Sequence, residues 1–145
     1  MKFAAKLAKM VKQGDVLALT GELGAGKTCF VKGLANELGV KETVTSPTFA
    51  LLKTYHGLMD LYHLDLYRLD RIEDLLDIGI EDYLPGDGIT VIEWGDKAGD
   101  LLPEDTLFID FRRGSTDDQR SIMIKARGRE WTERMGRFNY DGPRV

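Results

Sequence analysis

Residues 21–28 read Gly21-Glu22-Leu23-Gly24-Ala25-Gly26-Lys27-Thr28, which fits the phosphate-binding pattern G-x-x-x-x-G-K-[ST]. A short apolar run at residues 15–20 precedes this stretch and has the character of a buried strand. Residues 27–38 follow, with apolar side chains gathered on one helical face. The order of strand, glycine-rich turn and helix predicts a P-loop, the segment around which the rest of the chain is organised.

The residue types explain how such a loop would hold phosphate. Gly21, Gly24 and Gly26 allow backbone conformations that are closed to residues with a side chain. The N–H groups of the loop can then point inward and surround an anion, and the N-terminus of the helix adds its partial positive charge. Lys27 is predicted to reach the β- and γ-phosphates of a nucleotide, and the hydroxyl of Thr28 to bind the accompanying magnesium.

Composition restricts the class of protein. A chain of 145 residues is long enough for one domain with a proper core, which we assign to residues 1–128, with residues 129–145 as a C-terminal tail. The formal net charge of −4 argues against broad nucleic-acid binding by this chain alone. We expect no membrane segment, because no apolar run is long enough to span a bilayer. The single cysteine, Cys29, excludes an internal disulfide and fits a reducing cytoplasm.

Hydrophobic periodicity predicts the remaining elements. Residues 2–12 form an amphipathic helix, and residues 49–55 and 58–64 form a β-hairpin. A short helix with an acidic outer face is predicted at residues 70–78, and strands at 89–94, 101–111 and 121–126. The tail after residue 128 is charged and aromatic, so it is either a short helix or a segment that docks a partner.

Two acids end predicted strands. Asp65 occupies the usual position of a magnesium or water ligand in an α/β nucleotide site, although a helix N-cap or a simple strand-end turn is the alternative. Glu93 ends a β-branched run, where P-loop enzymes need an acid to hold magnesium or to orient water. Trp94 either covers the site or packs in the core. We interpret His63 as a structural histidine rather than a metal ligand.

Two further features near the loop are open to alternative interpretations. Residues 43–48 contain hydroxyl side chains, including Thr48, and form either a segment that senses the γ-phosphate or a loop that caps backbone groups. Cys29 lies in the first turn of the helix, where a reactive thiol is conceivable, but a small buried residue is the interpretation we favour.

Several segments together resemble one known family. With the P-loop, the chain contains Ser46-Pro47-Thr48-Phe49, then Tyr62-His63-Leu64-Asp65-Leu66-Tyr67-Arg68-Leu69, then Ile92-Glu93-Trp94, in that order. In this it resembles the TsaE family, small bacterial ATPases needed to make threonylcarbamoyladenosine in tRNA. The resemblance covers about residues 7–126. Two departures are Cys29, where the family commonly has threonine, and Gly95-Asp96, where it usually has proline and an acid.

The resemblance implies a P-loop NTPase-like α/β fold, with a mainly parallel central sheet flanked by helices and with antiparallel hairpin strands. It implies weak ATPase activity alone, partners that resemble TsaB and TsaD, and tRNA engaged only through that complex. It also implies roles for particular residues: Lys27 as phosphate clamp, Asp65 as an acid needed for turnover, and Thr28 and Glu93 as magnesium ligands. Contacts to ATP are then expected from Glu22, Leu23, Gly24, Ala25, Gly26, Lys27, Thr28, Cys29, Thr48 and Trp94.

Two other functions of P-loop proteins fit the sequence less well. A small-molecule or nucleotide kinase usually carries a lid with several arginines, whereas residues 70–82 are acidic. A GTP-binding switch usually carries an Asn-Lys-x-Asp segment, and residues 96–100 have neither the asparagine nor the spacing. The sequence therefore favours the ATPase subunit, with the kinase as the alternative.

Overall fold

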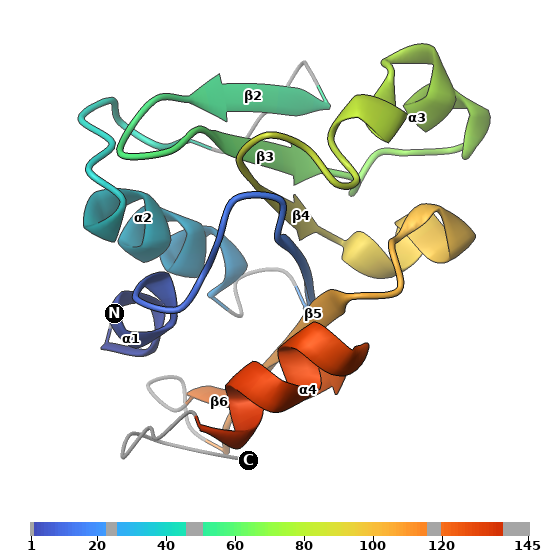
Figure 1. Ribbon diagram of the computed structural model, residues 1–145. Coiled ribbons are helices and arrows are strands. Elements are labelled where there is room, and N and C mark those ends of the chain that lie inside the picture. The colour runs from blue at the N-terminus through green and yellow to red at the C-terminus, as the bar shows by residue number, and fades with distance from the viewer. Residues whose placement is uncertain (1, 23–25, 46–50, 116–119, 138–145) are drawn as a thin grey trace.

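A six-stranded sheet forms the centre of the computed structural model, which describes residues 2–22, 26–45, 51–115 and 120–137 (Figure 1). The strand order is β2-β3-β4-β1-β5-β6. The strands are β1 (Val16–Gly21), β2 (Leu52–Tyr55), β3 (Leu61–Asp65), β4 (Ile89–Glu93), β5 (Thr106–Arg113) and β6 (Arg120–Arg127). The helices are α1 (Lys2–Ala8), α2 (Lys27–Glu37), α3 (Glu73–Asp77) and α4 (Arg129–Gly136), with two 3-10 helices, η1 (Ile80–Asp82) and η2 (Gly95–Leu101).

The centre of the sheet is parallel and its two edges are antiparallel. β1 pairs in parallel with β4 and with β5, and β3 pairs in parallel with β4. The outer pairs, β2 with β3 and β5 with β6, are hairpins. The predicted fold class, a mainly parallel α/β sheet with antiparallel hairpin strands, is confirmed.

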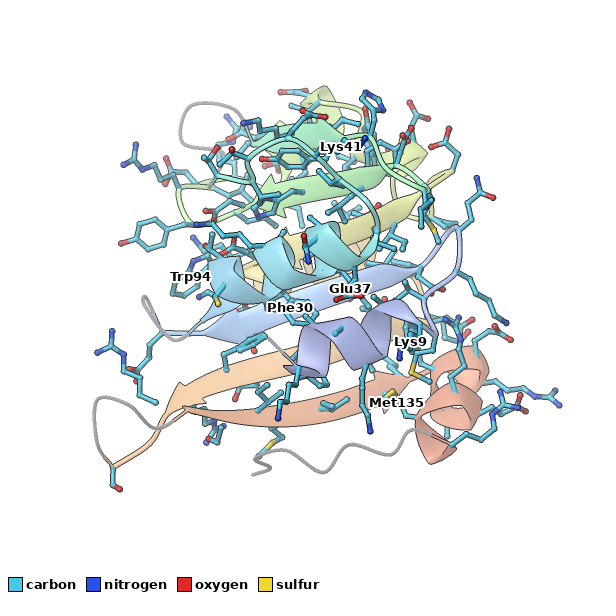
Figure 2. The ribbon with its side chains drawn as sticks, turned by 90° about the vertical axis from the view of Figure 1, so that its left-hand side faces the viewer. Lys9, Phe30, Glu37, Lys41, Trp94 and Met135 are labelled. Atoms are coloured by element: carbon cyan, nitrogen blue, oxygen red, sulfur yellow. The ribbon has the colours of Figure 1, made fainter. Side chains whose placement is uncertain are left out.

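Alternating side chains of the strands bury both faces of the sheet. On β1, Leu17 and Leu19 face the layer of α1 and α2, whereas Val16 and Ala18 face the layer that contains α3 and η2. Figure 2 shows α1 and α2 side by side in front of the sheet, with Phe30 between them. The Phe30 ring lies 5.6 Å from the rings of both Phe3 and Phe111, so this aromatic contact joins the two helices to β5.

The predicted helix at 27–38 and the hairpin before Asp65 are confirmed, but three boundaries differ. α1 ends at Ala8 rather than near residue 12; Val11 still packs in the core, which explains why the periodicity continues. α3 is shorter than residues 70–78. β5 begins at Thr106, because Leu101, which ends η2, and Leu102, which follows it, pack onto the second face of the sheet and not within a strand.

Among the described residues, no helix is both long enough and apolar enough to cross a membrane.

The α4 helix (Arg129–Gly136), which follows Gly128, packs on the core. Trp131 of α4 is completely buried in the same cluster as α1 and α2. The guanidinium of Arg134 lies over the Trp131 ring at 4.1 Å and donates to both carboxylate oxygens of Asp15, at 2.6 and 2.8 Å. It also donates to the backbone oxygen of Met10 at 3.1 Å. This buried pair fixes α4 to the loop that leads into β1.

We predict that Arg134→Ala destabilises the fold by about 3–5 kcal/mol, because it leaves the buried carboxylate of Asp15 without its partner. The matched control is Arg129→Ala on the same helix. Arg129 is 90% exposed in its pair with Glu133, so its loss costs about 0–1 kcal/mol. Urea unfolding of both variants measures the difference. Equal stability of the two variants would contradict the anchoring role of Arg134.

Candidate functional site

The candidate site lies where β1, β3 and β4 end. Parallel pairing aligns Leu19 of β1 with Glu93 of β4, and Glu93 with Asp65 of β3. Residues that follow or end these strands therefore meet at one edge of the sheet. Figure 2 shows Trp94 at this edge, near the N-terminal end of α2.

Two glycines of the loop have backbone conformations that require glycine. Gly21 has φ +129°, and a Cβ atom there would overlap the backbone oxygen of Phe111 on β5. Gly26 has φ +113°. These values agree with the role expected of loop glycines. Glu22 is exposed. The predicted contact residues Leu23, Gly24 and Ala25 lie outside the described residues.

The first turn of α2 has the character of an anion site. Its N-cap is Gly26, which has no side chain to satisfy the free N–H groups. The first turn contains no acidic residue that would offset the positive end of the helix dipole. A phosphate group is the ligand that such a helix end binds most readily.

Lys27 is 4% exposed, an unusual degree of burial for a lysine. Its ammonium donates a hydrogen bond to the backbone oxygen of Gly21 and lies 3.7 Å from the centre of the Trp94 ring. The aromatic face stabilises the cation electrostatically. Trp94, for which the sequence left two interpretations open, therefore borders the lysine and is only half-buried.

Four carboxylates lie near enough to this ammonium to influence its pKa. Burial lowers the pKa of Lys27, and the negative charges of Glu93, Asp65, Asp96 and Asp110 oppose that shift without cancelling it. Negative charges outnumber the positive one among these groups. A divalent cation at this position would reduce the repulsion between the acids.

Thr28 and Glu93, the two residues predicted to bind magnesium, are in direct contact. The Thr28 hydroxyl lies 3.1 Å from Oε1 and 3.3 Å from Oε2 of Glu93. α2 positions the hydroxyl and the end of β4 positions the carboxylate, which is buried. A hydroxyl beside a carboxylate is an all-oxygen pair of the kind that suits Mg²⁺.

Asp65 forms the strand-end turn that the sequence left open as an alternative. Its Oδ1 accepts a hydrogen bond from the backbone N–H of Tyr67 at 3.0 Å. The charge of this carboxylate partly opposes the lowering of the Lys27 pKa that burial causes. The turn therefore fixes the position of this carboxylate at the end of β3.

The strand end after Glu93 is tightly packed. Trp94 has φ +57°, which is unusual for a residue with a side chain, and its ring packs on Tyr67 at 5.2 Å. A Cβ atom at Gly95 would lie 2.7 Å from the Cβ of Ala18, too close for a van der Waals contact. The glycine that departs from the family pattern therefore lets η2 pack directly on β1.

Two residues of the site were not predicted from the sequence. His63 is buried and its Nε2 lies 2.6 Å from Oε2 of Glu93. Asp110 on β5 accepts hydrogen bonds from Thr20 at 2.9 Å and Arg112 at 2.7 Å. Burial raises the pKa of Asp110, but the two hydrogen bonds and the charge of Arg112 outweigh it and leave the pKa lowered. Strand alternation, which sets His63 on the same face as Asp65, was the available signal.

Two expectations near α2 have different outcomes. Cys29 is exposed, so the interpretation as a small buried residue is wrong; the side chain at this position of the first turn faces away from the core. Thr48 lies outside the described residues. Thr45, in the described part of the same loop, bonds through its backbone N–H to the Tyr55 hydroxyl at 3.2 Å and accepts from Lys53 at 3.1 Å.

The strand, the positive-φ glycines, the buried lysine and the threonine–glutamate contact define a P-loop protein of the α/β class. The chain belongs to the TsaE family: residues 1–122 match the family model described as threonylcarbamoyl adenosine biosynthesis protein TsaE.

Relatives support this membership. The chain is 49% identical over 118 residues to the tRNA threonylcarbamoyladenosine biosynthesis protein TsaE of Treponema pallidum, covering 81% of this chain and 87% of that protein. It is 42% identical over 132 residues to the protein of the same name from Bacillus subtilis, covering 90% and 82%. The crystal structure of Bacillus subtilis YdiB superimposes with a TM-score of 0.75 at 36% identity, covering 93% of this chain and 84% of that one.

We predict that Gly21→Ala destabilises the fold by about 1–3 kcal/mol through overlap with Phe111. The positive φ adds about 1–2 kcal/mol. Gly136→Ala is the control, because this glycine has open space around it and ends α4. Thermal unfolding compares the two variants. A Gly21→Ala protein as stable as the control would contradict the close approach of β1 and β5.

Proposed function

We propose that this protein binds ATP with magnesium at the site between α2 and β4 and hydrolyses it, as a subunit required for threonylcarbamoyladenosine modification of tRNA. One observation carries the proposal: a buried lysine and a threonine–glutamate contact lie together at a helix N-terminus flanked by positive-φ glycines. Membership of the TsaE family supports the assignment to tRNA modification.

The donor set fits magnesium nucleotide. Mg²⁺ is usually held by one or two protein oxygens, with phosphate oxygens and water completing an octahedron. Thr28 and Glu93 would supply the protein oxygens, and Asp65 adds a negative charge nearby. Bound magnesium would neutralise phosphate charge and orient the terminal phosphate for attack by water.

The residues of the chain then have separate tasks. Lys27 brings a positive charge from a buried position, where electrostatic interactions are stronger than in water. Glu93 holds a fixed carboxylate beside the hydroxyl of Thr28. The Trp94 ring holds the ammonium of Lys27 at the edge of the sheet, which limits the number of positions that the cation can adopt.

The same proposal includes partners. We expect weak hydrolysis by this chain alone, stimulation by proteins that resemble TsaD and TsaB, contact with tRNA only through their complex, and a cytoplasmic location. The names of the relatives support the pathway, because each is a tRNA threonylcarbamoyladenosine biosynthesis protein.

We predict that Lys27→Ala lowers magnesium-dependent ATP hydrolysis by about 100-fold or more, since it removes the positive charge that would face the phosphates. Lys32→Ala is the matched control, because Lys32 lies on the same helix with its side chain exposed. Phosphate release is measured for both variants after circular dichroism confirms that they fold. Unchanged hydrolysis in Lys27→Ala would contradict the phosphate-binding role of this lysine. Transfer of phosphate to added nucleosides or small alcohols would instead favour a kinase.

We also predict that the wild-type protein restores threonylcarbamoyladenosine in tRNA of a strain depleted of its own family member, whereas Lys27→Ala does not. Mass spectrometry of digested tRNA measures the modified nucleoside. Hydrolysis in vitro without restoration would separate the ATPase from the proposed pathway. A rise in hydrolysis when TsaD-like and TsaB-like proteins are added would support the proposed partnership.

A further inference from the structure

His63 is a buried polar side chain to which neither the P-loop pattern nor the proposed reaction gives a task. It lies on β3, is 0% exposed, and has buried neighbours along the strand in Leu61, Tyr62 and Leu64. Because an imidazole loses hydration when it is buried, it costs free energy at such a position unless its nitrogens are hydrogen-bonded. An apolar residue of similar size would fill the space without that cost.

The histidine makes its contact with the proposed magnesium ligand. Nε2 of His63 lies 2.6 Å from Oε2 of Glu93. The Thr28 hydroxyl faces both oxygens of the same carboxylate, at 3.1 Å from Oε1 and 3.3 Å from Oε2. Glu93 is therefore held from two sides, by β3 through the contact of His63 with Oε2 and by α2 through the Thr28 hydroxyl.

The contacts decide which ring nitrogen carries the proton. An ionised carboxylate only accepts hydrogen bonds, so the nitrogen that faces it has to be the donor. Nδ1 of His63 is buried and has no hydrogen-bond partner among the described residues. A proton on Nδ1 instead of Nε2 would leave a buried N–H unpaired and would set a lone pair against the carboxylate, and both arrangements are unfavourable. The tautomer protonated at Nε2 is the one that fits.

We infer that His63 is a positioning residue: by donating from Nε2 to Oε2 it fixes the carboxylate of Glu93 in the orientation that faces Thr28 and the magnesium site. The inference rests on the proposed function of Glu93 and Thr28. A glutamate side chain has several rotatable bonds, and magnesium demands near-ideal octahedral geometry, so a fixed carboxylate binds it better than a mobile one. Hydrogen-bond partners of metal ligands typically contribute about 10–100-fold to metal affinity or activity.

Two substitutions at His63 and one control test the inference. His63→Leu keeps an apolar side chain in the buried position and removes the donor. His63→Gln places an amide N–H as many bonds from Cβ as Nε2 of histidine, so it retains a donor. His56→Gln is the control, because His56 is exposed and bonds to Asp60, away from the site.

The first measurement is the magnesium concentration that half-saturates binding of a fluorescent ATP analogue. We expect His63→Leu to raise it about 10–100-fold, with nucleotide binding in EDTA unchanged. His63→Gln should recover most of the loss, and His56→Gln should behave as the wild type. A folded His63→Leu protein with the wild-type magnesium requirement would overturn the inference. If His63→Leu does not fold, a His63→Gln protein that folds but loses as much magnesium affinity as Thr28→Ala or Glu93→Ala would overturn it too.

The second measurement does not depend on nucleotide. Long-range proton–nitrogen NMR of imidazole-labelled protein reports the tautomer of each of its two histidines, and His56→Gln assigns the signals. We expect the proton of His63 on Nε2, with a shift of this signal alone in Glu93→Gln. A proton on Nδ1, or no response to Glu93→Gln, would overturn the positioning role. If the wild type shows no magnesium-dependent nucleotide binding, the proposed function fails, and the NMR result still decides whether His63 fixes Glu93.

Discussion

Parallel hydrogen bonding of β4 to both β1 and β3 sets the carboxyl ends of three strands at one edge of the sheet. The positions of Asp65 and Glu93 depend directly on this register. A shift of β3 by one residue would turn Asp65 and His63 to the opposite face, because side chains alternate along a strand. The apolar residues that bury both faces of β1 and β4 prevent such a shift, so the hydrophobic core and the site are specified by the same pairing.

Much of the fold could be predicted because local signals and tertiary packing agree. The P-loop, the helix after it and the hairpin before Asp65 all have sequence patterns that match their structure. The errors occur where apolar residues serve packing outside regular elements. Val11 is buried after α1 has ended, and Leu101 and Leu102 cover the sheet from the end of a 3-10 helix and the residue after it. Hydrophobic periodicity indicates which side chains are buried, but it does not indicate whether the backbone at those residues is helical or irregular.

Residues of the site that belong to one sequence motif could be predicted. Residues that meet only through contacts between strands could not. Lys27 and Thr28 belong to the P-loop pattern, and Glu93 is recognisable as an acid at the end of a predicted strand. The contact of His63 with Glu93 joins residues 30 positions apart, and Thr20 meets Asp110 across 90. Strand alternation sets His63 on the face of Asp65, but the local sequence does not identify Glu93 as its partner, because that contact is set by strand order. The contact of the Trp94 ring with the Lys27 ammonium likewise requires that β1 and β4 lie side by side.

The link between Arg134 and Asp15 has a consequence for the order of folding during synthesis. The two residues are 119 positions apart, and Phe3 and Trp131 belong to one core cluster. The first helix and the loop into β1 therefore leave the ribosome long before the helix that covers them has been made. A chain with this connectivity keeps apolar surface of its N-terminal part exposed until α4 emerges, which lengthens the interval in which nascent chains can associate wrongly.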